Sequence, residues 1–291
     1  MEFRQLEFFL AVAQGGSVTN AARNLHVAQP SLSQSLRRLE REVGATLFER
    51  VGRGMRITAA GEALLGPAKR IVREREDARA AVAAVAGLAG GRIKLASLPS
   101  LTVDPLPVMI GQFRAEYPLV RVTIAESQRV EEIVEQVEQG ACDLGVASTP
   151  VHSGDVVVHE VGVQRLVLLV PSGYPASHGK VSLEEMATMP FVCGPVGGSS
   201  RTALEDAMVS AGLDLAIVVE AESTEAIVPL VVARNGVTLI PEGLAATAPR
   251  AGVEVRATEP EITRTTAFLH RPGMSSPPAR AFVAMAAQLH P

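Results

Sequence analysis

The sequence lacks tryptophan, and phenylalanine and tyrosine bring its aromatic content to only 3% of 291 residues. A large aromatic cage around a ligand is therefore not expected. Two cysteines, Cys142 and Cys193, are too few for a disulfide framework or a zinc finger. The apolar runs are short, such as residues 166–170, and a membrane-spanning helix needs roughly 18 residues. The chain also opens without the basic and then apolar pattern of a secretory signal. We therefore expect a soluble, cytoplasmic protein.

The charge of the chain is unevenly distributed. Hydrophobic residues make up 47% of the sequence, enough for a sizeable core, and the length predicts about two domains. The net charge of −4, taken over the whole chain, argues against a nucleic-acid partner. Residues 1–91 carry a net charge of +4, however, and residues 92–291 carry −8. This asymmetry predicts a basic module and an acidic body with different partners.

The basic module has the spacing of a winged helix-turn-helix. Apolar periodicity predicts three short helices and a hairpin, at residues 3–13, 18–25, 30–43 and 46–58. If Leu32, Leu36 and Leu39 face inward, the opposite face of the third helix is polar and exposed. Glutamine there can pair with adenine, and arginine can pair with guanine or a phosphate. The candidate DNA-binding residues are Ser17, Gln29, Pro30, Ser31, Ser33, Gln34, Arg37, Arg50 and Arg53. The alternative is a helical bundle with ordinary solvated faces.

A long helix is expected to follow, capped by Thr58 and running from residue 59 to about residue 88. A seam along it alternates by four and three residues, which is typical of a coiled coil: Leu64, Ala68, Ile71, Arg75, Ala78, Val82 and Val85. The spacing predicts a dimerisation helix, although Arg75 interrupts the seam. The alternative is that this helix packs on its own module. A hinge at Gly90 and Gly91 would then end the linker, which divides the chain into residues 1–58, 59–91 and 92–291.

The acidic body alternates between strand-like and helix-like segments, which predicts an α/β fold with a mostly parallel sheet. Strands are expected at 92–97, 120–125, 144–147, 166–170, 191–193, 216–220, 237–240 and 265–270. Helices are expected at 107–116, 130–139, 202–211, 224–234 and 278–289. The order of these elements predicts two lobes. Lobe I would contain residues 92–162 and 266–291, and lobe II residues 163–265.

These motifs together resemble the LysR-type transcriptional regulators. The winged helix-turn-helix of that family is matched by LEFFLAVA from Leu6, SVTNAARNL from Ser17, HVAQPSLSQSLRRLE from His26, LFER from Leu47 and RITAAGE from Arg56. Ala28 departs from the pattern, because the family more often has serine there. The effector-binding half is matched by YPLVRV from Tyr117, GACDLGVA from Gly140, LVLLVP from Leu166 and VTLIPEGL from Val237. The resemblance therefore covers essentially the whole chain.

The resemblance implies both an architecture and a function. It implies an all-α N-terminal module with a winged helix-turn-helix, a linker helix, and a two-lobed α/β effector domain that looks like a periplasmic binding protein. The implied function is sequence-specific regulation of transcription, controlled by a small-molecule effector between the lobes. The implied partners are double-stranded DNA, other copies of the chain in a homotetramer built as a dimer of dimers, and RNA polymerase.

A ligand cleft is expected where the strands of the two lobes end, because open α/β sheets bind ligands beyond the carboxyl ends of their strands. Hydroxyl and amide side chains follow several of these ends, and free helix N–H groups with Arg201 would suit a small anion such as a carboxylate. The candidate effector-binding residues are Ser97, Ser100, Thr102, Gln128, Ser148, Thr149, Ser199, Arg201 and Thr224. The alternative is that each serine or threonine only caps its own helix.

The sequence contains no catalytic constellation. Its six histidines are scattered without metal-ligand spacing or a carboxylate partner, and no glycine-rich phosphate loop is present. We therefore expect no enzymatic activity, no cofactor and no metal. Two alternatives remain open. One is a redox-sensing regulator that uses Cys142 or Cys193, although buried unreactive thiols fit the pattern better. The other is a small-molecule binding protein or enzyme without a role on DNA.

Overall fold

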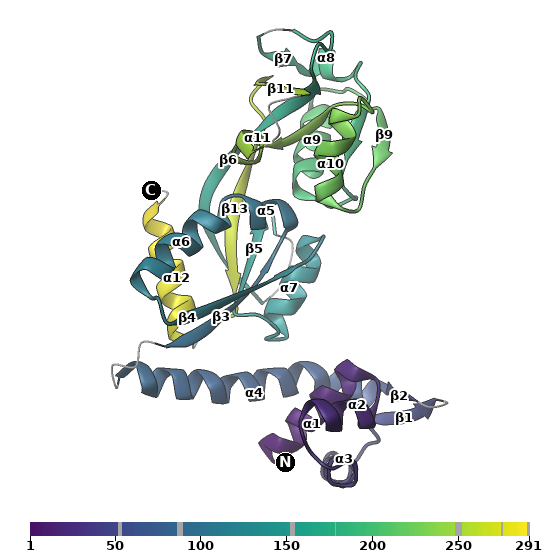
Figure 1. Cartoon of the computed structure of the whole chain (residues 1–291), viewed down its shortest axis with the longest axis vertical. Helices are drawn as coiled ribbons and strands as arrows, with labels where there is room; N and C mark the ends of the chain where they lie inside the picture. The colour runs from purple at the N-terminus through teal and green to yellow at the C-terminus, as the bar shows by residue number, and fades with distance from the viewer. Residues whose placement is uncertain are drawn as a thin grey trace. The chain divides into compact units, whose positions relative to one another are not determined.

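The computed structural model describes the chain except for residues 52–53, 86–89, 152–154, 178, 248–251, 275 and 290–291. The described residues separate into two compact units, one formed mainly by residues 1–88 and the other mainly by the rest of the chain (Figure 1). The first unit is helical with a small hairpin, and the second is an α/β unit with two lobes. This confirms the predicted fold class. Among the described residues, no helix is both long enough and apolar enough to cross a membrane.

The first unit begins with three short helices and a hairpin. They are α1 (Phe3–Gly15), α2 (Val18–Asn24), α3 (Gln29–Val43), β1 (Phe48–Val51) and β2 (Gly54–Ile57). Gly16 and Gly44 end α1 and α3 in the left-handed region, at φ of 58° and 72°. At the start of α2, the Ser17 hydroxyl accepts a hydrogen bond from the backbone N–H of Asn20 at 3.4 Å. These ends lie close to the positions that the sequence predicts.

The core of the first unit lies between α1, α3 and the hairpin. Leu32, Leu36 and Leu39 are buried, as their spacing predicts. The rings of Phe9 on α1 and Phe48 on β1 lie 5.3 Å apart, centroid to centroid. This packing leaves the opposite side of α3 exposed to solvent.

Helix α4 (Ala59–Val85) begins where the sequence predicts, but its seam divides into two parts. Residues 64–71 pack against the hydrophobic core of the first unit. Arg75 pairs with Glu7 of α1 at 3.2 Å, so the first part of the seam is occupied within its own unit. Val82 is 73% exposed, and the side chain of Val85 lies outside the described part of the chain. The first part of the seam therefore fits the alternative of packing within its own unit, and of the later part the structure describes Ala78 and Val82 as exposed.

Lobe I of the second unit is a sheet covered by helices on both faces (Figure 1). Its elements are β3 (Gly91–Ser97), α5 (Pro99–Val103), α6 (Leu106–Glu116), β4 (Val120–Glu126), α7 (Val130–Glu138), β5 (Leu144–Ser148), β13 (Thr263–His270) and α12 (Pro277–Leu289). Phe282 of α12 packs against Phe113 of α6 and Phe268 of β13, with ring centroids 5.1 Å and 5.5 Å apart. Gly145 on β5 lets Ile133 and Val137 of α7 approach the other face. The C-terminal segment thus completes the core of lobe I.

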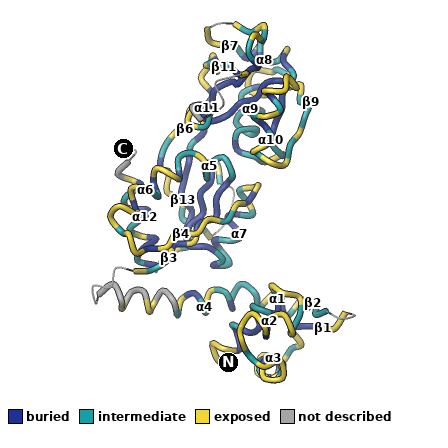
Figure 2. The backbone as a smooth tube through the Cα atoms, viewed as in Figure 1, coloured by how far each residue is buried: buried dark blue, intermediate teal, exposed yellow. Residues whose placement is uncertain are grey.

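Lobe II contains shorter strands and a second apolar core. Its elements are β7 (Val181–Ser182), α8 (Leu183–Met186), β8 (Phe191–Cys193), α9 (Ser199–Ser210), β9 (Ile217–Glu220), α10 (Thr224–Val232), β10 (Thr238–Pro241), α11 (Glu242–Thr247), β11 (Val253–Arg256) and β12 (Thr258–Glu259). Phe191, Met186 and Met208 are among the residues buried in this core. Buried residues concentrate in the strands of both lobes (Figure 2).

One long strand, β6 (Val157–Pro171), joins the two lobes. It pairs antiparallel with β13 and then with β10 and β11, so one sheet of order β10-β6-β13-β5-β3-β4 runs through both lobes. Two predictions are therefore corrected. The strand expected at residues 166–170 is the second half of a longer strand, and the sheet is not mostly parallel. The chain leaves lobe I in β6 and returns in β13, which makes these strands antiparallel. The first half of β6 is largely exposed, so it lacks the apolar run that predicts a buried strand.

Two histidines on these crossing strands stack on each other, although no motif in the sequence predicts that they pair. The rings of His159 on β6 and His270 on β13 lie 4.9 Å apart, and their Nε2 atoms are 2.8 Å apart. The Nδ1 atom of His270 lies 2.6 Å from the carbonyl oxygen of Arg271, so Nδ1–H donates there and Nε2 accepts from His159. Burial, with the neighbouring His270, lowers the pKa of His159. The contact between the two rings therefore joins β6 to β13.

We predict that Gly61→Ala destabilises the first unit. A Cβ at this position would lie 2.4 Å from the carbonyl oxygen of Leu47 and 2.5 Å from Cγ1 of Ile57, so the start of α4 would be pushed off the hairpin. Overpacking of this kind costs about 1–3 kcal/mol. Urea unfolding followed by circular dichroism measures the loss. Gly15→Ala is the matched control, because its Cβ would meet nothing within 4 Å. Equal stability of the two variants would contradict the prediction.

Candidate functional site

The first unit presents one polar face of α3 to solvent. Pro30, Gln34 and Arg37 are exposed and lie on the side of the helix opposite the buried leucines. Of the predicted DNA-binding residues, Gln29, Pro30, Ser31, Gln34, Arg37 and Arg50 are exposed, Ser17 and Ser33 are half-buried, and Arg53 lies outside the described residues. A helix with this exposed face has the width and the donors needed for the major groove of DNA.

The hairpin is fixed to α3 by a carboxylate. Oε1 of Glu40 accepts hydrogen bonds from the backbone N–H groups of Leu47 at 2.9 Å and Phe48 at 3.4 Å. This contact sets the position of β1, and hence of Arg50, relative to the polar face of α3. Glu40 was not among the predicted site residues, because in the sequence it is one more charged residue on a helix.

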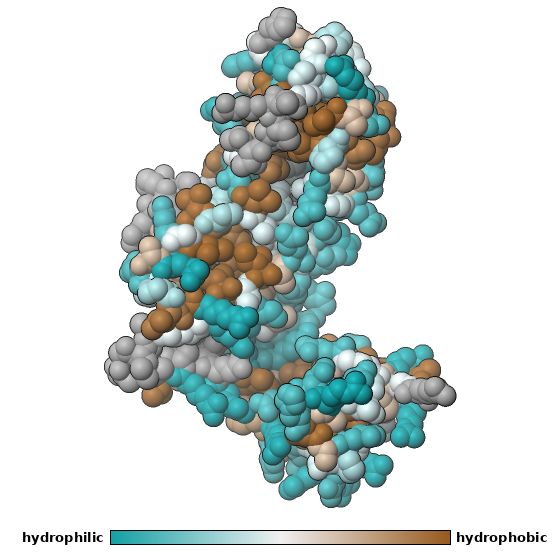
Figure 3. All heavy atoms as spheres, in the orientation of Figure 1, coloured by the Kyte–Doolittle hydropathy of each residue, from teal (hydrophilic) through white to brown (hydrophobic). Residues whose placement is uncertain are grey.

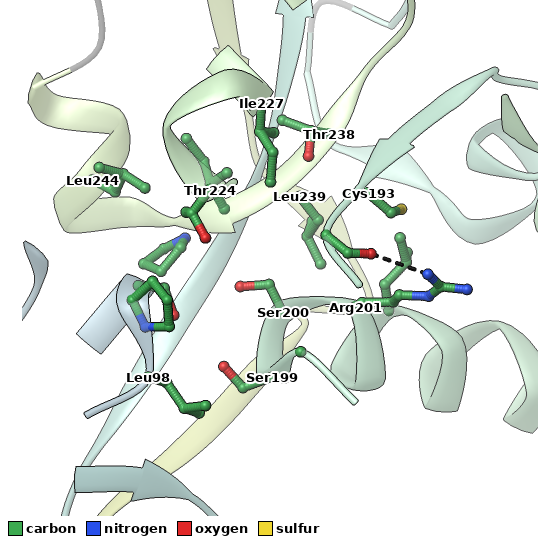
Figure 4. Close-up of a pocket in the computed structure, with 17 residues that line it drawn as sticks. Leu98, Cys193, Ser199, Ser200, Arg201, Thr224, Ile227, Thr238, Leu239 and Leu244 are labelled. Atoms are coloured by element: carbon green, nitrogen blue, oxygen red, sulfur yellow. Dashed lines mark hydrogen bonds between the residues drawn. The ribbon is translucent and has the colours of Figure 1, made fainter. Parts of the chain in front are cut away.

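The second unit contains a cleft between its two lobes. A small cavity of about 60 Å³ is bounded by the start of α5 in lobe I and by α9, α10 and β10 in lobe II (Figure 4). A larger cavity of about 620 Å³ adjoins it and shares Pro99, Thr224 and Leu244 with it. Of the predicted effector residues, Ser100, Ser199, Arg201 and Thr224 line the small cavity, and Gln128 and Thr224 line the larger one.

Four predicted residues do not line either cavity. Ser97 is fully buried and its hydroxyl donates to the carbonyl oxygen of Leu98 at 3.0 Å. The hydroxyl of Thr102 donates to the same oxygen at 3.3 Å. Ser148 is buried within the sheet, and the backbone N–H of Thr149 donates to Thr265 in the neighbouring strand at 2.9 Å. The hydroxyls of Ser97 and Thr102 therefore bind a local backbone oxygen, and neither caps a helix as the alternative had it.

Arg201 lines the small cavity but is not available as an anion clamp. It pairs with Glu205 at 2.7 Å and with Glu220 at 2.6 Å. Its Nη1 also donates to the carbonyl oxygen of Gly194 at 3.0 Å, and Figure 4 shows the guanidinium turned away from the Ser200 hydroxyl. The positive charge of Arg201 is thus neutralised inside lobe II. The sequence did not predict this pairing with two carboxylates.

A different arginine, Arg264 on β13, supplies the positive charge behind the cleft. It is only 4% exposed. Its Nη1 donates to the hydroxyl oxygens of three serines: Ser100 at 2.9 Å, Ser200 at 3.3 Å, and Ser199. Its Nε and Nη2 donate to Oε1 of Gln164 at 2.9 Å and 2.7 Å. Because α5 belongs to lobe I and α9 to lobe II, one buried guanidinium holds both lobes to the crossing strands.

The Arg264 network continues to a carboxylate. Nε2 of Gln164 donates to Oδ2 of Asp104 at 2.8 Å, and Asp104 is the opposing charge that favours protonated Arg264. Burial outweighs that attraction and lowers the pKa of Arg264 to about 10, so the guanidinium stays charged at neutral pH. Asp104 lies against α11 at Gly243, where a Cβ would come within 2.4 Å of Oδ2. This network was not predicted from the sequence. The one signal for it is Arg264 itself, an arginine inside an otherwise apolar and threonine-rich strand.

The cysteines do not form a redox pair. Both are buried. Cys142 lies between α7 and β5 in the chain, whereas Cys193 lines the small cavity of the cleft. Burial raises the pKa of the Cys193 thiol to about 11, although a reactive cysteine needs a lowered pKa. Within the described residues, no group of three or more histidine, cysteine, aspartate or glutamate side chains could hold a metal ion.

Two sequence families match the chain. The family described as "Bacterial regulatory helix-turn-helix protein, lysR family" matches residues 3–62. The family described as "LysR substrate binding domain" matches residues 86–290. The transcriptional regulator ClcR of Pseudomonas putida is 31% identical over 84% of this chain and 84% of its own length. The transcriptional dual regulator GltC of Bacillus subtilis is 32% identical over 92% of this chain and 90% of its own length.

Solved structures share the fold over the whole chain. A full-length OxyR variant from Pseudomonas aeruginosa has a TM-score of 0.79 at 23% identity, covering 100% of this chain and 95% of that one. Full-length CbnR in complex with its target DNA has a TM-score of 0.75 at 24% identity, covering 99% of both chains.

We predict that the Cys193 thiol of the native protein does not react at neutral pH. With a pKa of about 11, the thiolate is a minor species at pH 7 and grows only as the pH approaches 11. In a Cys142→Ser variant, reaction with dithionitrobenzoate at pH 7 is expected only after unfolding in guanidinium. The unfolded variant is the control for reagent access. Rapid labelling of the folded variant at pH 7 would contradict the prediction and revive a redox role.

Proposed function

The chain belongs to the LysR family of transcriptional regulators, and on that basis we propose how its two units divide the work of regulation. The predicted family membership is confirmed. The chain is a DNA-binding regulator with an effector-binding domain, and a redox-sensing function is not favoured. We propose that the first unit selects the DNA site through α3 and that the cleft of the second unit binds a small organic effector. No cofactor is part of this proposal.

The polar face of α3 is the observation that carries the DNA-binding part of the proposal. Gln34 and Arg37 are exposed on it, and their side chains suit the base edges of adenine and guanine. Arg50 on the hairpin suits the phosphate backbone. Ser17, at the start of α2, and Gln29, at the start of α3, place helix N–H groups where phosphates can bind. Ser31 and Ser33 complete the proposed contacts.

The cleft between the lobes carries the regulatory part of the proposal. Hydroxyl groups of Ser199, Ser200 and Thr224 are directed toward it. The paired strands β6 and β13 and the Arg264 hydrogen bonds are among the contacts that join the lobes. An effector that contacts both lobes would stabilise one relative arrangement of them. The chain's relatives are named as regulators, so we propose binding without turnover. We further propose a cytoplasmic location and contact with RNA polymerase.

We propose that the regulator is a homotetramer built as a dimer of dimers. Two edge strands support an interface between copies: β4 ends the main sheet, and β9 ends the pairing with β8. Exposed apolar side chains accompany them, namely Val108, Leu119 and Ile124 in lobe I and Val209 and Val218 in lobe II. The exposed Val82 on α4 offers a second, independent contact.

We predict that Gln34→Ala relaxes the choice of one base in the binding site. Loss of a two-bond contact to a base costs about 1–3 kcal/mol of discrimination at that position. Arg50→Ala, by contrast, is expected to weaken binding to all sequences and to flatten the salt dependence. Selection from random duplexes followed by gel-shift titration measures both effects. Gln112→Ala on α6 is the control, because Gln112 is an exposed glutamine of the second unit. An unchanged sequence preference in Gln34→Ala would exclude Gln34 as a reader of bases.

We predict that Leu119→Asp separates the oligomer. Leu119 is 69% exposed beside β4, and a carboxylate there would have to be buried against another copy. Light scattering after gel filtration should give a multiple of 30.6 kDa for the wild type and a smaller multiple for the variant. Val163→Asp introduces the same charge at a similarly exposed valine of β6 and should leave the mass unchanged. A monomeric wild type would refute the proposed assembly.

A further inference from the structure

The two ends of the cleft differ in charge, and this difference indicates the chemical class of the effector. The inference rests on the proposal above that the cleft binds an effector. The small cavity is surrounded by hydroxyl groups in front of the buried Arg264 guanidinium. The adjoining cavity is lined by Glu126 of lobe I and by Glu222 and Glu225 of lobe II. No arginine or lysine is among the described residues that line it.

The small cavity is built to receive an anion. The hydroxyl oxygens of Ser100, Ser199 and Ser200 accept hydrogen bonds from Arg264, so their protons are free to donate elsewhere, and the nearby cation polarises them. Ser199 is more than nine-tenths buried. Figure 4 shows the hydroxyls of Ser199, Ser200 and Thr224 directed toward the same space. An acceptor with several lone pairs, such as a carboxylate, matches this arrangement.

Two further features of the small cavity agree with a carboxylate. Ser199 begins the twelve-residue helix α9, whose N-cap Gly198 provides no side-chain cap, so the helix N-terminus favours a negative group. The acceptors recorded for Arg264 are all uncharged oxygens of Gln164 and the serines. The volume of about 60 Å³ is roughly a tenth of the 620 Å³ of the adjoining cavity. Only a small head group fits, and the remainder of a ligand must extend into the larger cavity.

The larger cavity favours a cation. Glu126 and Glu222 are exposed to it from opposite lobes, and neither has a hydrogen-bonding or ionic partner among the residues that the structure describes. Glu225 also lies in the first turn of α10, where its charge stabilises the helix, so it is the weaker indicator. A second carboxylate on the ligand would be repelled here, whereas an ammonium group would be attracted.

We propose that the effector is a small zwitterion, an amino acid or related amino carboxylate. Its carboxylate binds at Ser199, Ser200 and the N-terminus of α9. Its ammonium group lies between Glu126 and Glu222 and so bridges the two lobes. The two ends together then select a zwitterion, because neither charge alone satisfies both ends of the cleft.

Isothermal titration of the full-length protein with defined probes tests the proposal. The probes are the proteinogenic amino acids and straight-chain ω-amino acids. Each probe that binds is compared with the carboxylate, the amine and the dicarboxylate of the same carbon skeleton. We expect the zwitterion to bind at least about tenfold more tightly than its matched carboxylate, because only the zwitterion satisfies both ends. A carboxylate or dicarboxylate that binds as tightly as the zwitterion would overturn the proposal, as would the failure of every amino carboxylate to bind.

Variants test which end of the cleft binds the ammonium group and which end binds the carboxylate. In a Glu126→Gln/Glu222→Gln double variant, the preference for the zwitterion over the carboxylate should fall to near unity. In Ser200→Ala, both probes should weaken by about tenfold. Glu131→Gln/Glu184→Gln is the matched control, because it also removes one charge from each lobe but neither residue lines a cavity. A preference that persists in the Glu126→Gln/Glu222→Gln variant would overturn the assignment.

The failure of this inference can be distinguished from failure of the proposed function. If carboxylates bind and are weakened by Ser200→Ala without any preference for an amino group, the cleft is an effector site and the zwitterion is wrong. If no probe of any class binds while the same preparation forms a specific complex with DNA, the zwitterion is again wrong and the regulator function stands. Loss of the specific DNA complex itself would refute the proposed function.

Discussion

The buried charge of Arg264 is the constraint on which the arrangement of the second unit depends. A guanidinium that is 4% exposed must have its donors satisfied, because an unpaired buried charge is far more costly than a missing apolar contact. Its acceptors come from α5 in lobe I, α9 in lobe II and the crossing strand β6. Any movement that opens the lobes must therefore break hydrogen bonds to a charged group. The same side chain contacts serines that line the small cavity, so the contact between the lobes lies directly beside the space that a ligand would enter.

The strands β6 and β13 explain why that side chain can act on both lobes. They run antiparallel between the lobes, and they carry Gln164 and Arg264 side by side at the crossing. Gln164 links Arg264 to Asp104, and Asp104 lies against Gly243 of α11. Position 243 must remain free of a side chain for this contact to exist. The crossing thus combines two features. The paired strands β6 and β13 form a continuous sheet that both lobes share, and the hydrogen bonds of the polar cluster can break and form again.

The sequence predicted most of the local elements, because periodicity, glycine stops and caps are local signals. Helix α3 begins at Gln29 and ends before Gly44, close to the prediction from Pro30 and Gly44. The prediction failed where structure depends on residues distant in sequence. Arg201 looked suited to an anion, but Glu220 neutralises it across lobe II. Arg264 was not among the predicted site residues, and only the return of β13 beside β6 brings it to the serines. Ser97 and Thr102 were assigned to the cleft by position, but their hydroxyls bind the backbone.

The net charge of −4 conceals three electrostatic environments rather than two. The basic first unit suits DNA, and the acidic second unit lowers unspecific attraction of the whole chain to phosphates. Within the acidic unit, however, the positive charge of Arg264 is buried, and the space next to it is the small cavity. Because a buried charge is screened little by salt or water, this one arginine can attract an anion despite the surrounding negative charge. The acidic surface then selects among anions by repelling those that carry a second negative group, so the same excess of carboxylates that limits unspecific DNA binding also narrows the range of ligands.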